Sequence, residues 1–364
     1  MKKHTYIIAE AGVNHNGSVE MAKDLIIAAA KAGVDAVKFQ TFKAEAVAVK
    51  KAPKAAYQAE TTDGGESQLE MLRRLELSLD AYPALMELCK EQGVDFLSKP
   101  SDMDSLRFLA EECKLPILKV SSGEVTNFPF LIAIARTGLP VIFSTGMSTL
   151  GETELALGAL AYGYMHHESF PQGEGNFHDA YTEAHESGLL KEKVRLLHCT
   201  TEYPAPFDEV NLAAMDTLRQ AFGLEVGYSD HTEGIAVPVA AVARGATIIE
   251  KHFTLDRTLP GPDHKASLEP KELAAMVAEI RQIEAAVGDG IKHPTEREQR
   301  NLLIVRKSLV AKVAIHKGER FTEENLTIKR PAFGMSPVYY WKLLGKQASQ
   351  DYAEDDLIRE DKVI

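Results

Sequence analysis

The sequence has few cysteines, no long apolar run and no excess of positive charge. Its 364 residues include three cysteines, Cys89, Cys113 and Cys199, and no CxxC pair, which argues against a disulfide framework or a cysteine zinc site. No apolar run reaches the ~20 residues that a membrane-spanning helix needs. The apolar stretch after Lys2 and Lys3 is too short for a signal peptide, so we expect a cytoplasmic protein with no membrane partner.

The charge balance argues against nucleic acids and anionic membrane surfaces as partners. Lysine and arginine total 41 and aspartate and glutamate total 53, which leaves a formal net charge of −12. Such an acidic chain does not favour nucleic acid or an anionic membrane surface. A phosphate-bearing ligand would therefore need a local basic pocket. The content of 45% hydrophobic and 26% charged residues is ordinary for a globular protein.

Short β-branched runs alternate with amphipathic helical patterns along most of the chain. The predicted strands cover residues 5–11, 36–42, 95–100, 117–122, 140–146, 194–200, 225–232 and 247–254. Eight βα units in about 255 residues match a (β/α)8 TIM barrel in number and length. An open doubly wound sheet is the alternative, but no GxGxxG motif follows the first strand. We therefore predict an α/β barrel.

A second, smaller domain is expected after the barrel. We predict the barrel over residues 1–287, a polar linker over 288–304 and the small domain over 305–364. The linker contains GDGIKHPTEREQRN, and short strand and turn patterns follow it. About 60 residues can fold independently.

Two connections between predicted strands are unusually long. Residues 43–80 follow the second strand, at the carboxy-terminal face where barrel enzymes place their active sites, so we expect a rim or lid there. Residues 163–192 precede the sixth strand and should lie on the opposite face, far from the site. Their histidines suggest a metal site, but a solvated loop insertion is the favoured interpretation. These histidines are His166, His167 and His178.

Polar residues occupy the carboxy-terminal ends of the predicted strands, at positions that point into a barrel. The positions are Glu10, Lys38, Gln40, Lys119, Ser122, Glu124, Ser144, Thr200 or Thr201, Ser229, His231, Glu250 and His252. Charged groups are almost never buried without a partner, so core packing does not explain them. The pattern indicates an active site.

His231 and His252 end neighbouring predicted strands with the same inward parity. A single histidine at a strand end is more often a core residue or a general base. The pair, with Glu250 two residues before His252, favours a site for a divalent first-row metal. Two histidine ligands would leave open positions for water or a substrate oxygen.

Lys38 and Lys119 point into the same predicted barrel mouth. Three serines belong to neighbouring strand ends: Ser122, Ser144 and Ser229. Two ammonium groups beside serines form a local anion site that suits a ligand with both phosphate and carboxylate. A Schiff-base aldolase with a nucleophilic lysine is the rival interpretation, although that chemistry needs no metal. Lys99 is either a third cation of this site or a surface lysine.

Ordered motifs run through the whole chain. They are AEAGVNHNG (9–17), VKFQTF (37–42), LKVSSGE (118–124), STGM (144–147), LHCTTEYPAP (197–206), GYSDHT (227–232), EKHFT (250–254) and GPDH (261–264). Together they resemble the sialic acid synthase family, which includes N-acetylneuraminate, legionaminate and pseudaminate synthases. The KSLVA and LTIKRPAFGMSP segments within 307–337 resemble the antifreeze-like, or SAF, domain of that family.

The resemblance implies a (β/α)8 barrel followed by a SAF domain in a domain-swapped homodimer. It also implies that phosphoenolpyruvate condenses with an N-acetylated mannose-type sugar to give a nine-carbon 2-keto acid and phosphate. The enzyme expected on this basis is an N-acetylneuraminate synthase that uses N-acetylmannosamine. The nearest alternative is a legionaminate or other nonulosonate synthase that uses a 6-deoxy diacetamido sugar.

The same motifs imply roles for individual residues. A divalent metal, Mn²⁺ or Mg²⁺, is assigned to His231 and His252. Phosphoenolpyruvate is assigned to Lys38, Lys119, Ser122, Ser144 and Ser229. The sugar is assigned to Glu124, Tyr203, Asp263 and Arg330, of which Arg330 would reach from the partner subunit. Catalytic roles near the metal and its waters are assigned to Glu10 and Glu250.

The chain departs from the family pattern in two places. Lys99 stands where the family often has threonine, and the KRP motif continues as Ala332-Phe333-Gly334 instead of a glycine-asparagine-glycine turn. A non-enzymatic interpretation would make the carboxy-terminal module an ice- or glycan-binding domain. That module alone would not need lysines and histidines at the strand ends of a barrel.

Overall fold

The structure, a computed structural model, describes residues 4–63 and 65–359 and divides the chain into two compact units. The units are residues 1–288 and 289–364. The outer ends of the two predicted domains, residues 1–3 and 360–364, lie outside the described part. Each unit has its own cluster of buried apolar side chains.

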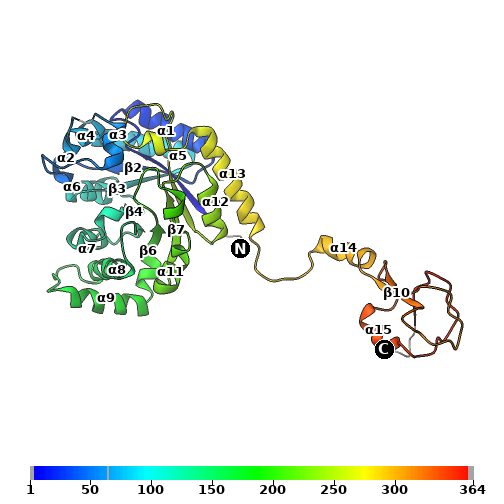
Figure 1. Ribbon diagram of the computed structural model, residues 1–364. Helices are drawn as coiled ribbons and strands as arrows, with labels where there is room; N and C mark the ends of the chain where they lie inside the picture. Colours follow the sequence, from blue (N-terminus) through cyan, green and yellow to red (C-terminus); the bar gives the residue numbers. More distant parts are fainter. Residues whose placement is uncertain (1–3, 64, 360–364) are drawn as a thin grey trace. The chain divides into compact units, whose positions relative to one another are not determined.

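The first unit contains a ring of parallel strands (Figure 1). Its strands within the described residues are β1 (Tyr6–Gly12), β2 (Ala36–Thr41), β3 (Asp95–Pro100), β4 (Leu118–Val120), β5 (Val141–Ser144), β6 (Val194–His198), β7 (Glu225–Asp230) and β8 (Ile248–His252). Their order is β3-β2-β1-β8-β7-β6-β5-β4, and each hydrogen-bonded pair is parallel. Because β3 and β4 are also in contact, the sheet is nearly closed and the predicted (β/α)8 barrel is confirmed.

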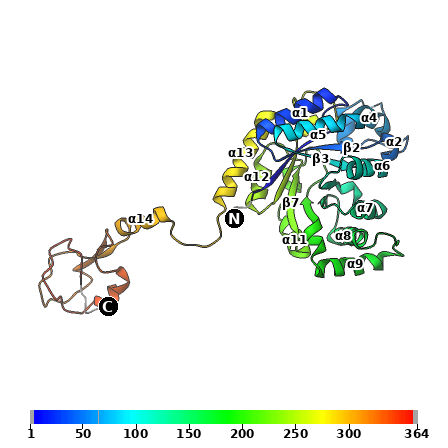
Figure 2. The ribbon, with the colours of Figure 1, turned by 180° about the vertical axis from the view of Figure 1, so that it is seen from behind.

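Helices surround the strands, as the two opposite views show (Figures 1 and 2). The helices of this unit are α1 (Val19–Ala32), α2 (Ala44–Val47), α3 (Ala56–Thr61), α4 (Gln68–Leu75), α5 (Tyr82–Gln92), α6 (Met103–Arg107), α7 (Phe128–Arg136), α8 (Leu150–Met165), α9 (Glu174–Glu186), α10 (Leu189–Lys193), α11 (Ala214–Phe222), α12 (Ala236–Ala243) and α13 (Pro270–Ala286). The Ser18 side chain caps the start of α1, and Gly33, at φ 84°, ends it in a left-handed conformation. Among the described residues, no helix is long and apolar enough to cross a bilayer.

The register of the strands brings the polar strand-end residues together. Glu10 pairs with Lys38 on β2 and with His252 on β8, while Ser229 on β7 pairs with Glu250. Side chains alternate along a strand, so these residues share the inner face of the barrel. The observed strands end earlier than several of the predicted ones, because the polar residues beyond them form turns.

The segment 163–192 is not the solvated loop that its polar sequence suggested. Helix α9 occupies much of it and packs on α8, with Phe177, Ala180 and Ala184 buried. At Gly158 on α8, a Cβ would lie 2.4 Å from the carbonyl oxygen of Phe177, so only glycine allows this approach. The prediction of a loop was wrong because the i, i+3, i+7 spacing of these three apolar residues is enough to form a buried helix face although the residues around them are polar. Among the described residues, no group of three or more metal-ligating side chains includes His166, His167 or His178.

A buried ion pair joins β7 and β8 on the side of the sheet that faces the helices. Lys251 Nζ lies 2.5 Å from Asp230 Oδ2, and both side chains are fully buried. Lys251 also donates a hydrogen bond to the carbonyl of Thr232. Asp230 and Lys251 directly precede His231 and His252, so this pair fixes the relative position of the two imidazoles.

The second unit is built around a small antiparallel sheet. Its elements in the described residues are α14 (Glu296–Val305), β9 (Ser308–Ala311), β10 (Leu326–Lys329) and α15 (Tyr340–Leu343). Leu309, Phe321 and Ile358 are among the residues of its core. All of helix α14 except Val305 lies in the stretch predicted as a linker, because a capping box of Thr295 and Glu298 starts a helix that the polar composition concealed.

The Asp230–Lys251 ion pair leads to a prediction about the free energy of unfolding of single and double variants. Lys251→Met should destabilise the barrel by about 3–5 kcal/mol, because it leaves the Asp230 carboxylate buried without a cation. The double variant Lys251→Met, Asp230→Leu should lose clearly less free energy of unfolding, because no unpaired charge is left in the barrel. Urea unfolding followed by far-UV circular dichroism at 222 nm measures both.

The fluorescence of the single tryptophan, Trp341, provides the control because this residue belongs to the second unit. The urea midpoint reported by Trp341 fluorescence should be the same in both variants as in the wild type. An equal loss in the single and double variants would contradict a stabilising role of the pair.

Candidate active site

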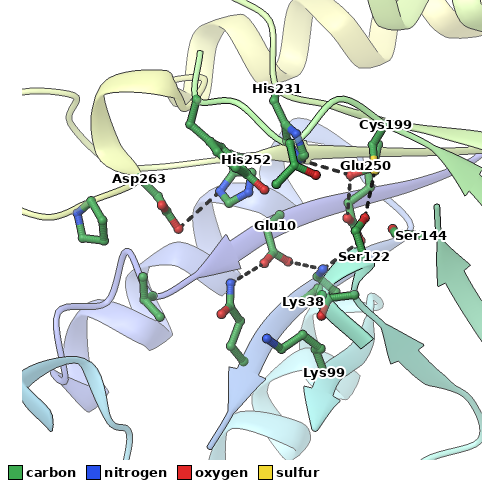
Figure 3. A pocket seen from close by; sticks show the side chains of 18 of the residues that line it. Glu10, Lys38, Lys99, Ser122, Ser144, Cys199, His231, Glu250, His252 and Asp263 are labelled. Atoms are coloured by element: carbon green, nitrogen blue, oxygen red, sulfur yellow. Dashed lines mark hydrogen bonds and ion pairs between the residues drawn. The ribbon is translucent and has the colours of Figure 1, made fainter. Parts of the chain in front are cut away.

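A cavity of about 210 Å³ lies at the carboxy-terminal ends of the strands (Figure 3). Each of the eight strands contributes at its end or in the loop that follows. The strand-side lining includes Glu10, Lys38, Gln40, Lys99, Lys119, Ser122, Ser144, Cys199, Thr201, Tyr203, Ser229, His231, Glu250, His252 and Asp263. Most of the residues selected from the sequence are therefore together in one cavity.

Lys38 is at the centre of the charge arrangement. Its Nζ lies 2.9 Å from Glu10 Oε2 and 2.8 Å from Glu250 Oε2, and all three side chains are buried. Gln40 also donates a hydrogen bond of 3.1 Å to Glu10 Oε1. Burial alone would lower the pKa of Lys38, but the two carboxylates outweigh it and raise that pKa. Lys38 is therefore a fixed positive charge.

Lys119 forms a second buried cation beside the serines. Its Nζ donates a 2.7 Å hydrogen bond to Ser144 Oγ and lies 3.7 Å from Glu250 Oε1. Ser229 Oγ donates to the same oxygen of Glu250 at 2.8 Å. Burial lowers the pKa of Lys119 to about 8. Ser122 Oγ accepts a hydrogen bond from the backbone N–H of Gly146.

Lys99 also faces the cavity, so the interpretation of a surface lysine is wrong. Burial lowers its pKa, and the charges of Glu124, Lys38, Glu10 and Asp263 act on it. No hydrogen bond or ion pair of its ammonium group occurs with any other residue in the described part of the chain. The parity of β3 places it on the same inner face as Lys38.

The two strand-end imidazoles lie next to each other. The ring centres of His231 and His252 are 5.6 Å apart. His231 Nδ1 donates to the carbonyl of Thr200 at 2.5 Å, which leaves Nε2 as the lone-pair nitrogen. His252 Nδ1 is buried without a hydrogen-bond partner in the described residues and lies 3.8 Å from Asp263 Oδ2. Burial lowers the pKa of His231 to about 4 and that of His252 well below its usual value.

Neutral imidazoles with available lone pairs are the form in which histidine binds a metal. The second nitrogen of His231 is oriented by a backbone carbonyl, as is typical of metal-binding histidines. Within residues 4–63 and 65–359, no group of three or more His, Cys, Asp or Glu side chains is arranged to hold a metal by itself. The pair thus fits a metal ion whose remaining positions are filled by water or substrate.

A row of aromatic rings in contact leads from the imidazoles to the connection that follows β2. Tyr203 lies 4.1 Å from His231, measured between ring centres, and Tyr57 of α3 lies 4.9 Å from Tyr203. Asp263 faces the same region, and burial, with Glu10 nearby, raises its pKa to about 7. The connection that follows β2, residues 43–63 and 65–80, therefore reaches the site at the carboxy-terminal ends of the strands. This stretch is called the lid segment below.

Two predicted sugar contacts are not among the residues that line the cavity. Glu124 lies just beyond them and accepts a 2.8 Å hydrogen bond from Asn127. Arg330 belongs to the second unit and is exposed there.

Sequence reasoning also missed several cavity residues. Those of the lid segment are Tyr57, Gln58, Met71, Leu72 and Leu75. No local pattern could identify them, because only the position of the connection after β2 pointed toward the site.

Comparison with known proteins gives two family matches. Residues 25–292 match the model of the NeuB family, and residues 306–364 match that of the SAF domain. The first match covers most of the barrel and the second covers the small unit. The combination agrees with the order of motifs in the sequence.

The relatives include several sugar-acid synthases. The N,N'-diacetyllegionaminic acid synthase of Campylobacter jejuni is 52% identical over 98% of this chain and 100% of that protein. The enzyme of the same name from Legionella pneumophila is 42% identical over 95% of this chain and 91% of that protein.

Among solved structures, the N-acetylneuraminic acid synthetase of Leptospira borgpetersenii aligns with a TM-score of 0.65 and 33% identity. The alignment covers 82% of this chain and 90% of that one. With most of the barrel matched by the family model and relatives matched over nearly their whole length, the chain belongs to the NeuB family of synthases and carries a SAF domain.

Proposed function

We propose that this protein is an N,N'-diacetyllegionaminic acid synthase. It condenses phosphoenolpyruvate with a 6-deoxy diacetamido sugar and releases phosphate. Two relatives with this name share 52% and 42% identity with the chain, against 33% for the neuraminic acid synthetase, so the comparisons favour this acceptor over N-acetylmannosamine. The observation that supports the proposal most strongly is that two buried lysines and a pair of neutral imidazoles line the same cavity.

Phosphoenolpyruvate would be held by the basic side of the cavity. Lys38 and Lys119 supply buried ammonium groups, Ser122 and Ser144 supply hydroxyl groups, and Ser229 lines the same side with its hydroxyl donated to Glu250. Charge-assisted hydrogen bonds of this type are stronger than neutral ones and suit a phosphate and a carboxylate. The ammonium group of Lys99 faces the same cavity and has no hydrogen-bond or ion-pair partner among residues 4–63 and 65–359.

The imidazoles of His231 and His252 would hold the divalent metal, Mn²⁺ or Mg²⁺. A metal held by these two imidazoles would supply Lewis-acid polarisation of the aldehyde carbonyl of the open-chain sugar. Tyr203 and Asp263, which lie beside the imidazoles, would position the sugar.

The carboxylates of Glu10 and Glu250 line the same cavity and would face the positive charge that develops during the reaction. Carbon 3 of phosphoenolpyruvate attacks the aldehyde carbon, and carbon 2 becomes electron-poor. Negative groups fixed nearby stabilise this charge without reorganisation. Water then adds to carbon 2 and gives up a proton, which balances the proton taken up by the former aldehyde oxygen, and phosphate leaves by cleavage of the C–O bond to yield the 2-keto acid.

We also propose that the protein acts as a domain-swapped homodimer in which Arg330 completes the site of the partner subunit. In the second unit, Arg330 is exposed, as are the apolar side chains of Phe333, Val338 and Trp341. A guanidinium followed by Pro331 is a fixed donor fork, suited to an acetamido oxygen or a hydroxyl of the sugar.

The reaction is tested by phosphate release from phosphoenolpyruvate over a panel of amino sugars. We expect the highest kcat/KM with the 6-deoxy diacetamido sugar, loss of turnover after chelation, and recovery with Mn²⁺ or Mg²⁺. Phosphate release with none of the sugars would contradict the proposal. A covalent adduct trapped by borohydride would instead indicate a Schiff-base aldolase.

Lys119→Met should weaken phosphoenolpyruvate binding specifically. Loss of charge-assisted hydrogen bonds costs roughly 1.5–3 kcal/mol, so the KM for phosphoenolpyruvate should rise about 10- to 150-fold. The KM for the sugar should change little. Lys193→Met, which alters a lysine just before the amino-terminal end of β6, is the control and should behave as wild type. An unchanged KM for phosphoenolpyruvate in Lys119→Met would refute its assignment.

Subunit mixing tests the role of Arg330. Arg330→Ala and His252→Ala should each be inactive alone. In a twofold dimer, random exchange of equal amounts makes half of the dimers mixed, each with one intact site, so about a quarter of the wild-type rate should return. Absence of recovery, with mixed dimers demonstrated by mass spectrometry, would show that Arg330 does not act across the interface.

A further inference from the structure

The cavity has two chemically different sides. Its strand side carries the lysines, carboxylates, serines and imidazoles described above. Another side of the cavity is lined by four apolar residues, which carry no charge and no hydrogen-bond donor in their side chains: Val13, Met71, Leu72 and Leu75. The last three lie on α4 of the lid segment, and Val13 follows β1. We call these four residues the apolar wall.

The apolar wall is held in place by its own packing. Val13, Met71 and Leu75 form a small core with Phe42, and Leu72 packs on the edge of this core. Helix α4 begins with a capping box in which the Ser67 side chain accepts from the backbone N–H of Glu70. The wall is therefore present before any ligand binds.

The lid segment is also tied to the loops around the imidazoles. The ring of Tyr57 contacts that of Tyr203 in a tilted arrangement, and Thr61 contacts the carbonyl of Pro262. Lys54, whose side chain is buried, donates to Thr62 Oγ1 at 2.8 Å and lies 3.5 Å from Glu66 Oε1. These contacts keep α3 and α4 over the strand ends.

The chemistry of the wall determines what it can contact. Phosphoenolpyruvate carries phosphate and carboxylate groups, which need donors that the wall lacks. The acceptor of the proposed reaction has a methyl group at carbon 6 and a second acetamido group, where N-acetylmannosamine has hydroxyls. Burying a methyl group is favourable, whereas burying a hydroxyl without a partner costs about 1–3 kcal/mol.

We propose that the apolar wall contacts the methyl-bearing end of the acceptor and selects the 6-deoxy diacetamido sugar against N-acetylmannosamine. This inference rests on the function proposed above. It makes Leu72 and Val13 specificity-determining residues for the acceptor, with no part in binding phosphoenolpyruvate.

Two variants test the wall from its two sides. Leu72→Gln introduces a polar group on α4, where the leucine is only partly buried. Val13→Thr replaces a methyl by a hydroxyl of similar size, so the fold is retained even if α4 tolerates glutamine poorly. We expect each to lower the ratio of kcat/KM for the 6-deoxy sugar to that for N-acetylmannosamine about tenfold. The KM for phosphoenolpyruvate should stay within about twofold, because the wall does not touch that ligand.

The matched controls are Leu72→Met, which keeps the wall apolar, and Leu79→Gln, which changes a partly buried leucine of the same segment outside the cavity. Both should retain the wild-type ratio. An unchanged ratio in both Leu72→Gln and Val13→Thr, or a rise of the KM for phosphoenolpyruvate equal to that for the sugar, would overturn the inference. A wild-type enzyme that releases phosphate with neither sugar would instead overturn the proposed function, so the two failures are distinct.

Discussion

The site depends on the buried contact of Lys38 with Glu10 and Glu250. It connects β2 to β1 and β8 at the point where the strands end. A cation between two carboxylates is tolerated in a dry environment only when each charge has a partner, so the three residues must stay together. Because Glu10 pairs with His252 in the register, the same contact also sets the distance between the lysines and the imidazoles.

The charges around this contact explain how an acidic chain presents a basic pocket. Three lysines, Lys38, Lys99 and Lys119, face the cavity together with three carboxyl groups, those of Glu10, Glu250 and Asp263. Because burial raises the pKa of Asp263 to about 7, this carboxyl is only partly ionised near neutral pH, so the lysines outweigh the carboxylates locally in a protein whose formal net charge is −12. The excess is local and enclosed, which makes it stronger than the same charge on the surface.

Much of the strand side could be predicted from the sequence because the rule that places it is local. Alternation along a strand put His231, Glu250 and His252 on one face, and the observed register agrees. The apolar wall, by contrast, depends on how the lid segment packs across the barrel mouth, and its leucines look like ordinary helix core. Helix α9 was missed for a related reason, since its apolar spacing lies among polar residues that suggested a loop.

This difference between the two sides has a consequence for the family as a whole. The strand ends are fixed by the barrel register, so a change there disturbs the contacts of neighbouring strands. The lid segment meets the strands mainly through its own small core and the Tyr57–Tyr203 contact, so its lining residues can change with little effect on the lysines and imidazoles. A fold arranged in this way can keep one chemistry at the strand ends while the lid adapts to different sugars. Relatives matched over nearly their whole length are named as synthases of legionaminic, pseudaminic and neuraminic acids, and such an arrangement allows this variety.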